Sequence, residues 1–182
     1  MKKVISASNN AVKIRLVRPS DTLEIQRVEK EFYEGSSCLL EVLGCWIESL
    51  PENFLVARIG GKIVGFIFFE YLNCVKALPF IHNFSHQKNG AYAYVSDVGV
   101  SDGFSEAGVL QKLLDEMLKK SVKDGIKAVV WLTGNKRPHD KVEQALLIKN
   151  GFIRGEKVEK WESSPGHFVT DHALWTKKIA SE

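Results

Sequence analysis

The sequence predicts a mixed α/β domain in which strands outnumber helices and share one sheet. Three observations predict this class. Apolar runs within 54–71 flank Gly60-Gly61, which indicates a tight hairpin because glycine adopts positive φ at low cost. Within 91–132, an alternating apolar–polar segment is followed by a turn, an amphipathic segment and an apolar run. This succession is typical of a strand–helix–strand unit. Two more strand-like segments fill 152–178 and close the chain.

The first quarter of the chain predicts one strand and two helices. Residues 12–18 alternate in the manner of a strand. Asp21, with Glu24 three residues later, predicts a capping box at the start of the first helix. A second helix is predicted over much of 37–50 and ends at Pro51. The first helix has an apolar stripe at helical spacing, formed by Ile25, Val28 and Phe32.

The later elements complete the predicted order. Residues 73–90 are polar and irregular and predict a loop. The clearest helix covers 106–123, followed by a continuously apolar strand at 127–132 and a helix over 138–150 capped by Gly151. The order is β-α-α-β-β-β-α-β-α-β-β, which predicts a mixed, mostly antiparallel sheet of about seven strands with helices on both faces.

Length and composition fit one soluble domain. The chain of 182 residues is 45% hydrophobic and 26% charged, so we expect a single domain over 1–182, with 1–11 as a flexible or edge segment. A net charge of +3, with no basic stripe among exposed aromatics, gives no support to nucleic-acid binding. No apolar run approaches a membrane span, and the N-terminus is too weakly apolar for a signal peptide.

The cysteines indicate the cellular compartment of the protein. Their number is odd and they form no C-x-x-C pair, which predicts reduced thiols in a cytoplasmic protein; they are Cys38, Cys45 and Cys74. Cys38 and Cys45 are seven residues apart, so they could share a helix face as small buried side chains.

The segment 91–114 is the most informative part of the chain for function. A strand leads through a short turn into an amphipathic helix, and a helix start offers unpaired N–H groups and the positive end of the dipole to a phosphate. With Lys149-Asn-Gly-Phe152, this segment resembles the acyl-CoA site of the GNAT superfamily of N-acetyltransferases. The resemblance covers about Val12 to Ile179 and implies the fold whose element order was given above.

The resemblance assigns a pyrophosphate-binding turn. In the family this turn usually reads Gln/Arg-x-x-Gly-x-Gly/Ala; here Ser105, Gly108 and Leu110 occupy the three key positions, so only the central glycine is kept. The Glu106 carboxylate would repel phosphate, or act as an ordinary first-turn acid that stabilises the helix dipole. The residues implied to hold the cofactor here are Ser105, Glu106, Ala107, Gly108, Val109 and Leu110.

A second signature lies at 145–152, which resembles the family's Leu-Tyr-x-Lys-x-Gly-Phe run. Lys149 matches, whereas Leu147 stands where many members carry the tyrosine that protonates the CoA thiolate. Asp140 falls where many members have an asparagine near the cofactor. The alternative for Gly151-Phe152 is a plain helix cap followed by a core strand residue.

The resemblance also implies where catalysis would occur. Acyl transfer needs a neutral amine and donors for the developing oxyanion; in the family a backbone N–H of the fourth strand donates, here among Val98, Gly99 and Val100. Asp97 is the candidate base and Glu70 the second, each with the alternative of a salt-bridged or solvated acid. Tyr94 and Tyr92 share one face of the strand, and three roles are open for them. They line the acceptor pocket, they replace the missing acid, or they pack in the core.

No metal site is predicted. His82 and His86 stand four apart in the loop but lack a third ligand, and no nucleophile elbow is present. The implied function is transfer of an acetyl group from acetyl-CoA to a primary amine of a small molecule or peptide, within a ternary complex, as in an acyltransferase of the EC 2.3.1 class. The alternative is a catalytically impaired module that binds acyl-CoA or a protein partner for regulation. The acceptor, the acyl chain length and homodimer formation are left open.

Overall fold

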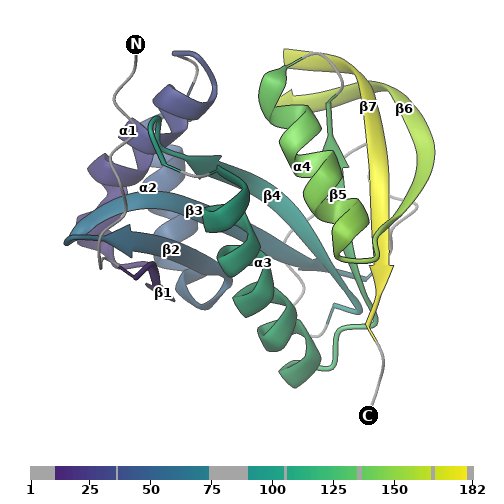
Figure 1. The fold of residues 1–182 in the computed structure, drawn as a ribbon, viewed down its shortest axis with the longest axis horizontal. Helices are drawn as coiled ribbons and strands as arrows, with labels where there is room; N and C mark the ends of the chain where they lie inside the picture. The colour runs from purple at the N-terminus through teal and green to yellow at the C-terminus, as the bar shows by residue number, and fades with distance from the viewer. Residues whose placement is uncertain are drawn as a thin grey trace. The chain divides into compact units, whose positions relative to one another are not determined.

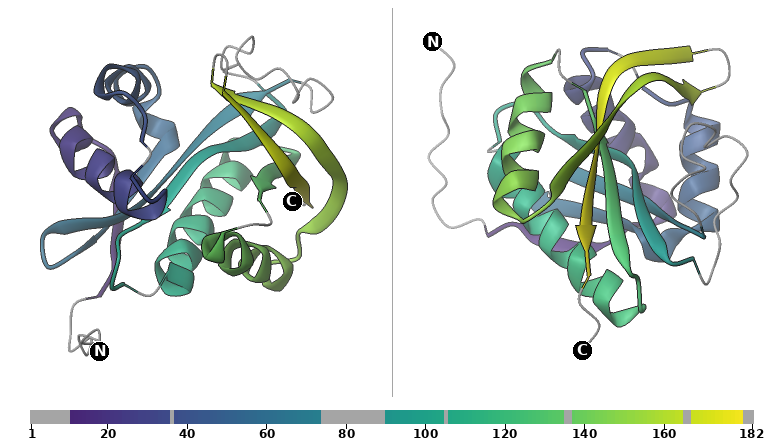
Figure 2. Two further views of the ribbon diagram at one scale, coloured as in Figure 1. Left: turned by 90° about the horizontal axis from the view of Figure 1, so that it is seen from above. Right: turned by 90° about the vertical axis from the view of Figure 1, so that its right-hand side faces the viewer.

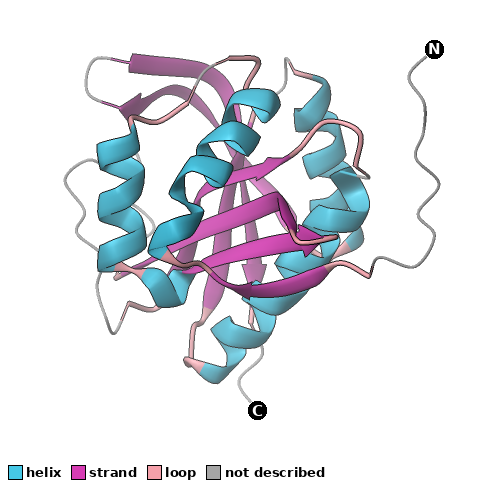
Figure 3. Cartoon of the chain, turned by 90° about the vertical axis from the view of Figure 1, so that its left-hand side faces the viewer, coloured by secondary structure: helices cyan, strands magenta, loops and turns pink. Residues whose placement is uncertain are grey.

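The computed structural model describes residues 11–35, 37–73, 90–104, 106–134, 137–164 and 167–179. Their element order confirms the predicted one (Figure 1), with two short 3-10 turns added. Helices and strands are distinguished by colour in Figure 3. The helices are α1 (Thr22–Phe32), α2 (Leu40–Ser49), α3 (Glu106–Lys123) and α4 (Pro138–Lys149). The strands are β1 (Lys13–Leu16), β2 (Phe54–Ile59), β3 (Lys62–Leu72), β4 (Tyr92–Val100), β5 (Ala128–Thr133), β6 (Ile153–Ser164) and β7 (His167–Lys178).

The strands form one seven-stranded mixed sheet in the order β1-β2-β3-β4-β5-β7-β6. β4 and β5 are parallel, with Tyr92 opposite Ala128, and α3 is their crossover helix. The pairs β1/β2, β2/β3, β5/β7 and β6/β7 are antiparallel. The predicted mixed, mostly antiparallel sheet is therefore confirmed.

The chain divides into two compact units. The first comprises 1–68 and 97–117, and the second comprises 69–96 and 118–182. The single domain over 1–182 stays a prediction. The flexible or edge segment over 1–11 also stays a prediction, because residues 1–10 lie outside the described part. None of the helices in that part is long and apolar enough to cross a membrane.

In the first unit, helices cover both faces of the strands. A Cβ atom at Gly65 would meet Val109 of α3, whereas the next side chain along β3, Phe66, belongs to the core shared with α1 and α2. Successive strand residues point to opposite faces, so α3 lies on one face and α1 and α2 on the other (Figure 2, left). The core on the α1–α2 face contains Val17, Ile25, Val28, Leu43, Ile47, Phe54, Val56, Ile63, Phe66 and Phe68.

In the second unit, buried tryptophans of β5 and β7 donate hydrogen bonds inside the core. Trp131 is 1% exposed, and its Nε1 donates to Oε2 of Glu143 on α4 at 3.1 Å. Trp175 donates to Oγ1 of Thr133 at 2.9 Å. Each buried indole N–H therefore has a hydrogen-bond partner. Without a partner, its burial would destabilise the folded state.

Three local predictions were wrong. The side chain of Asp21 makes no cap hydrogen bond to α1; it accepts bonds from Arg15 and from the Arg18 N–H, because a 3-10 turn precedes the helix. α2 begins at Leu40, so Cys38 lies before it and does not share a helix face with Cys45. Cys45 is exposed rather than buried.

Candidate functional site

Two oppositely charged side chains of α1, Arg27 and Glu31, form hydrogen bonds with the turn that follows β4. Arg27 donates to the carbonyl of Ile63 at 2.8 Å and to Oγ of Ser101 at 3.1 Å. Oε2 of Glu31 accepts from the N–H of Asp102 at 3.2 Å. These bonds fix the chain where it leaves the sheet, in the stretch directly before α3.

The helix that the turn leads into has the predicted start. α3 begins at Glu106, and Gly108 in its first turn is exposed. The N–H groups of a first turn have no partner within the helix, so this end can face an anion. Ser105 lies outside the described residues, and Glu106 and Ala107 are placed only as helix backbone.

The next two residues of the predicted turn are buried in the core. Val109 is 2% exposed and Leu110 is fully buried. A leucine at the position where the family has a small residue is therefore explained by packing in this chain.

Asp97 of β4 is the centre of a buried polar cluster in the first unit. The residue is 8% exposed, and its Oδ1 accepts from the Tyr33 hydroxyl at 3.0 Å and from the Val98 N–H at 2.8 Å. Val98 was one of the three predicted oxyanion donors, and in this structure Asp97 engages its N–H group. The carboxylate is thus oriented by two donors from different elements.

Gly99 is required by packing. A Cβ atom there would lie 2.8 Å from Cε1 of Phe66 and 3.5 Å from Cβ of Phe32, so a side chain would displace the Phe66 ring. Val98 and Val100 are each 4% exposed. The three residues predicted to face the acyl group are therefore all packed in the first unit.

Two further residues lie beside Asp97 that the sequence reasoning did not identify. Glu29 of α1 and Cys38, which precedes α2, have ligand-type atoms within 4.8 Å of one another and of an Asp97 carboxylate oxygen. Glu29 is 3% exposed, and its Oε1 accepts from the Cys38 N–H at 2.9 Å. One signal was available: Glu29 falls four residues after Ile25, on the apolar stripe of the helix.

Burial sets the proton affinity of this pair. Burial raises the pKa of Glu29 above its usual value, and the contacts with the Cys38 N–H and thiol and the charge of Lys30 offset only part of that rise. Burial also raises the pKa of the Cys38 thiol, and the neighbouring carboxylates of Glu29 and Asp97 raise it further. Both shifts favour the protonated form of the side chain.

The second unit holds the other predicted catalytic residues. Oε2 of Glu70 accepts from the Ser96 hydroxyl at 2.7 Å, and burial raises the pKa of Glu70 in spite of that bond. Tyr94 is 5% exposed and Tyr92 is half-buried. Glu70 and Ser96 thus form a polar pair within this unit.

The predicted residues of α4 have local partners. Asp140 is 1% exposed; its carboxylate accepts from the Arg137 N–H at 2.8 Å and from the Arg137 guanidinium at 3.1 Å. Leu147 is fully buried, and Lys149 is exposed. His82 and His86 lie outside the described residues.

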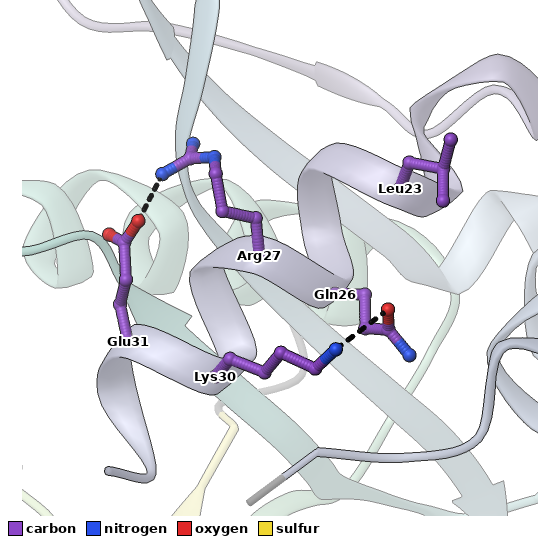
Figure 4. Close-up of a pocket in the computed structure, with 5 residues that line it drawn as sticks. All are labelled: Leu23, Gln26, Arg27, Lys30 and Glu31. Atoms are coloured by element: carbon purple, nitrogen blue, oxygen red, sulfur yellow. Dashed lines mark hydrogen bonds and ion pairs between the residues drawn. The ribbon is translucent and has the colours of Figure 1, made fainter. Parts of the chain in front are cut away.

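One surface hollow lies on the outer face of α1, lined by Leu23, Gln26, Arg27, Lys30 and Glu31 (Figure 4). Arg27 and Glu31 form an ion pair at 2.5 Å, and Lys30 donates to Gln26 at 3.3 Å. The polar groups are engaged with one another and none of the predicted site residues is present. The hollow is therefore not the candidate site.

Comparison with known proteins gives the family. The model of the acetyltransferase (GNAT) family matches residues 20–152. None of the curated protein sequences is significantly similar to the chain.

Solved structures share the fold at low identity. The loading GNATL domain of CurA from Lyngbya majuscula is 16% identical, with a TM-score of 0.76 over 93% of this chain and 98% of that one. The yncA protein from Salmonella typhimurium, with its cofactor acetyl-CoA, is 14% identical, with a TM-score of 0.70 over 95% and 96% of the two chains. The diaminobutyrate acetyltransferase EctA from Paenibacillus lautus, in complex with L-2,4-diaminobutyric acid and coenzyme A, is 14% identical, with a TM-score of 0.70 over 94% and 96%.

Proposed function

The chain belongs to the acetyltransferase (GNAT) family, and on that premise we propose that it transfers an acetyl group from acetyl-CoA to a primary amine of a small molecule or peptide. The observation that carries the proposal is the β4–turn–α3 segment. It joins a strand to a helix whose first turn has an exposed glycine, Gly108, at the position of the family's central glycine.

The proposed cofactor contact is electrostatic. The pyrophosphate of acetyl-CoA accepts hydrogen bonds from backbone N–H groups of residues 105–110, where the positive end of the α3 dipole lies. Two similar structures contain such a ligand, since the yncA protein holds acetyl-CoA and EctA holds coenzyme A. The missing Arg or Gln at Ser105 removes a side-chain donor, so the affinity rests on the backbone.

The proposed reaction is a direct transfer in a ternary complex. The neutral amine nitrogen attacks the thioester carbonyl, the C–N bond forms, the C–S bond breaks and coenzyme A leaves. Asp97 accepts the amine proton, directly or through a water molecule, with Glu70 as the second candidate base. Because Leu147 carries no hydroxyl, the thiolate takes its proton from Tyr94, another nearby acid or solvent.

The acceptor class is proposed from the family and from one substrate complex. EctA holds L-2,4-diaminobutyric acid, a small molecule with primary amines. The location we propose is the cytoplasm, as the odd cysteine count suggested.

The test has two stages. Calorimetric titration with acetyl-CoA measures binding, and release of free CoA thiol is then followed with a panel of small amines and peptides. Binding together with amine-dependent thiol release supports the enzyme. Binding without release for any amine points to the impaired acyl-CoA module, and no binding at all contradicts both.

A further inference from the structure

Glu29, Cys38 and Asp97 come from a helix, a loop and a strand, and they converge in the first unit. A carboxylate oxygen of Glu29, a carboxylate oxygen of Asp97 and the Sγ atom of Cys38 all lie within 4.8 Å of one another. Ligands of zinc lie about 2.0–2.3 Å from the ion, which puts neighbouring ligand atoms about 3.5 Å apart. Small side-chain rotations would therefore bring these three atoms around one cation.

One oxygen of the cluster is buried and has no hydrogen bond. Oε2 of Glu29, in a residue that is only 3% exposed, makes no hydrogen bond of normal geometry within the described part of the chain, and the Cys38 thiol beside the carboxylate is only a weak donor. No ion pair to Glu29 is formed by the described lysines, arginines or histidines either. A buried acceptor normally has a partner, so this oxygen lacks one that a cation would supply.

Hydrogen-bond donors orient the two carboxylates, as the groups that surround the ligands of metal sites do. The Cys38 N–H donates to Oε1 of Glu29 at 2.9 Å. The Tyr33 hydroxyl and the Val98 N–H donate to Oδ1 of Asp97 at 3.0 and 2.8 Å. Such bonds fix the orientation of ligating carboxylates and commonly strengthen metal binding.

We propose that Glu29, Cys38 and Asp97 bind one divalent cation of the zinc class. Three protein ligands with a fourth position for water make up a tetrahedral site of the open type. The cysteine excludes Mg²⁺ and Ca²⁺ as preferred occupants, because those ions take oxygen ligands, whereas a thiolate favours zinc and its borderline neighbours. On binding, the thiol proton of Cys38 leaves to solvent and the sulfur coordinates as thiolate.

The metal site goes beyond the proposed acyl transfer and does not rest on it. A cation at this site occupies the Asp97 carboxylate that is proposed to receive the amine proton. Binding of the cation and proton transfer to Asp97 therefore exclude each other, and the form of the protein active in acyl transfer would be the metal-free one.

The experiment uses Co²⁺ as a spectroscopic probe and Zn²⁺ as competitor, on full-length protein first treated with a chelator and a reductant. A bound Co²⁺–thiolate gives a charge-transfer absorption in the near ultraviolet that oxygen ligands do not give. We expect one Co²⁺ per chain with this absorption, and its loss when Zn²⁺ is added. Cys38→Ser should lose the absorption, whereas Cys45→Ser, a matched change of an exposed cysteine, should keep it.

A second variant tests whether Cys38 binds the cation alone or together with Glu29. Glu29→Gln keeps an acceptor for the Cys38 N–H but removes the charge, so we expect its Zn²⁺ affinity to fall at least tenfold. The proposal is overturned if the wild-type protein shows no thiolate absorption, if Cys38→Ser retains it, if Cys45→Ser loses it to the same extent, or if Glu29→Gln binds Zn²⁺ as tightly as wild type.

Discussion

The hydroxyl of Tyr33, the residue directly after α1, donates a hydrogen bond of 3.0 Å to Oδ1 of Asp97, in the middle of β4. The two residues are 64 positions apart in the chain. The bond joins the first helix to the strand that carries the proposed base, and it sets which way the carboxylate points. The same oxygen also accepts the Val98 N–H, so the orientation depends on both donors.

The first prediction concerns this bond. Tyr33→Phe removes one donor to a buried carboxylate, which should lower the free energy of unfolding by about 1–3 kcal/mol. Urea unfolding followed by fluorescence measures it. Tyr92→Phe is the control, because the Tyr92 hydroxyl has no hydrogen bond within the described residues; equal losses in both variants would show that the Asp97 bond contributes nothing.

The second prediction tests Asp97 as the base. Asp97→Asn retains an oxygen that can accept from Tyr33, but it cannot take up a proton at neutral pH. Turnover of an accepted amine should fall about 100-fold or more, whereas acetyl-CoA affinity stays the same. The loss should shrink at high pH, where the amine is already deprotonated. Full activity of this variant across the pH range would remove Asp97 from the reaction and leave Glu70 or water as the base.

The third prediction tests the cofactor contact at the start of α3. Gly108→Asp adds bulk and a negative charge where the pyrophosphate is proposed to bind, so affinity for acetyl-CoA should fall roughly tenfold or more. Gly108→Ala adds bulk alone and should cost less. Calorimetry measures both, with circular dichroism to confirm the fold. Wild-type affinity in the aspartate variant would place the cofactor elsewhere.

The fourth prediction contrasts two glycines in the first unit. A Cβ atom at Gly65 would lie 2.7 Å from Cγ1 of Val109 and 3.1 Å from the Gly99 carbonyl oxygen, whereas one at Gly44 of α2 meets nothing within 4 Å. Gly65→Ala should therefore destabilise the protein by about 1–3 kcal/mol, and Gly44→Ala should stabilise it by about 0.5–1 kcal/mol. Thermal unfolding of the pair checks the signs; stabilisation by Gly65→Ala would mean that α3 does not pack closely against β3.

The fifth prediction concerns pH. Burial by itself raises the pKa of Asp21, but the bonds from Arg15 and from the Arg18 N–H outweigh it and hold this pKa below the ordinary value of 3.8. A lowered folded-state pKa contributes stability above the unfolded-state value, and this stability is lost as the pH falls through the folded-state value. Asp21→Asn should be less stable than wild type at pH 7, with the difference vanishing in acid below the folded-state pKa.

The control for the pH experiment is Glu48→Gln, which changes an exposed carboxyl group on α2. Melting temperatures of the three proteins are measured from neutral pH downward. A difference between Asp21→Asn and wild type that stays constant into strong acid would contradict the assignment, because it would not follow the protonation of Asp21.

The sequence by itself determined the elements and their order. The hairpin at Gly60-Gly61 and the helix over 106–123 lie where local propensity and periodicity put them, and the structure has α3 with the same bounds. These signals are local, since glycine chemistry and apolar spacing act within a few residues. The capping box at Asp21 failed because a 3-10 turn precedes the helix and the Asp21 carboxylate bonds to the Arg18 N–H and to Arg15 of β1, a partner that no local pattern shows.

Only the tertiary structure decided which polar residues meet. Glu29, Cys38 and Asp97 have no spacing that suggests a common site, because they come from separate elements joined only by folding. Glu29 gave a weak hint by interrupting the apolar face of α1, but the sequence did not say what it faces. The desolvation that raises its pKa, and the approach of Cys38 and Asp97, exist only when α1, the chain before α2 and β4 pack together.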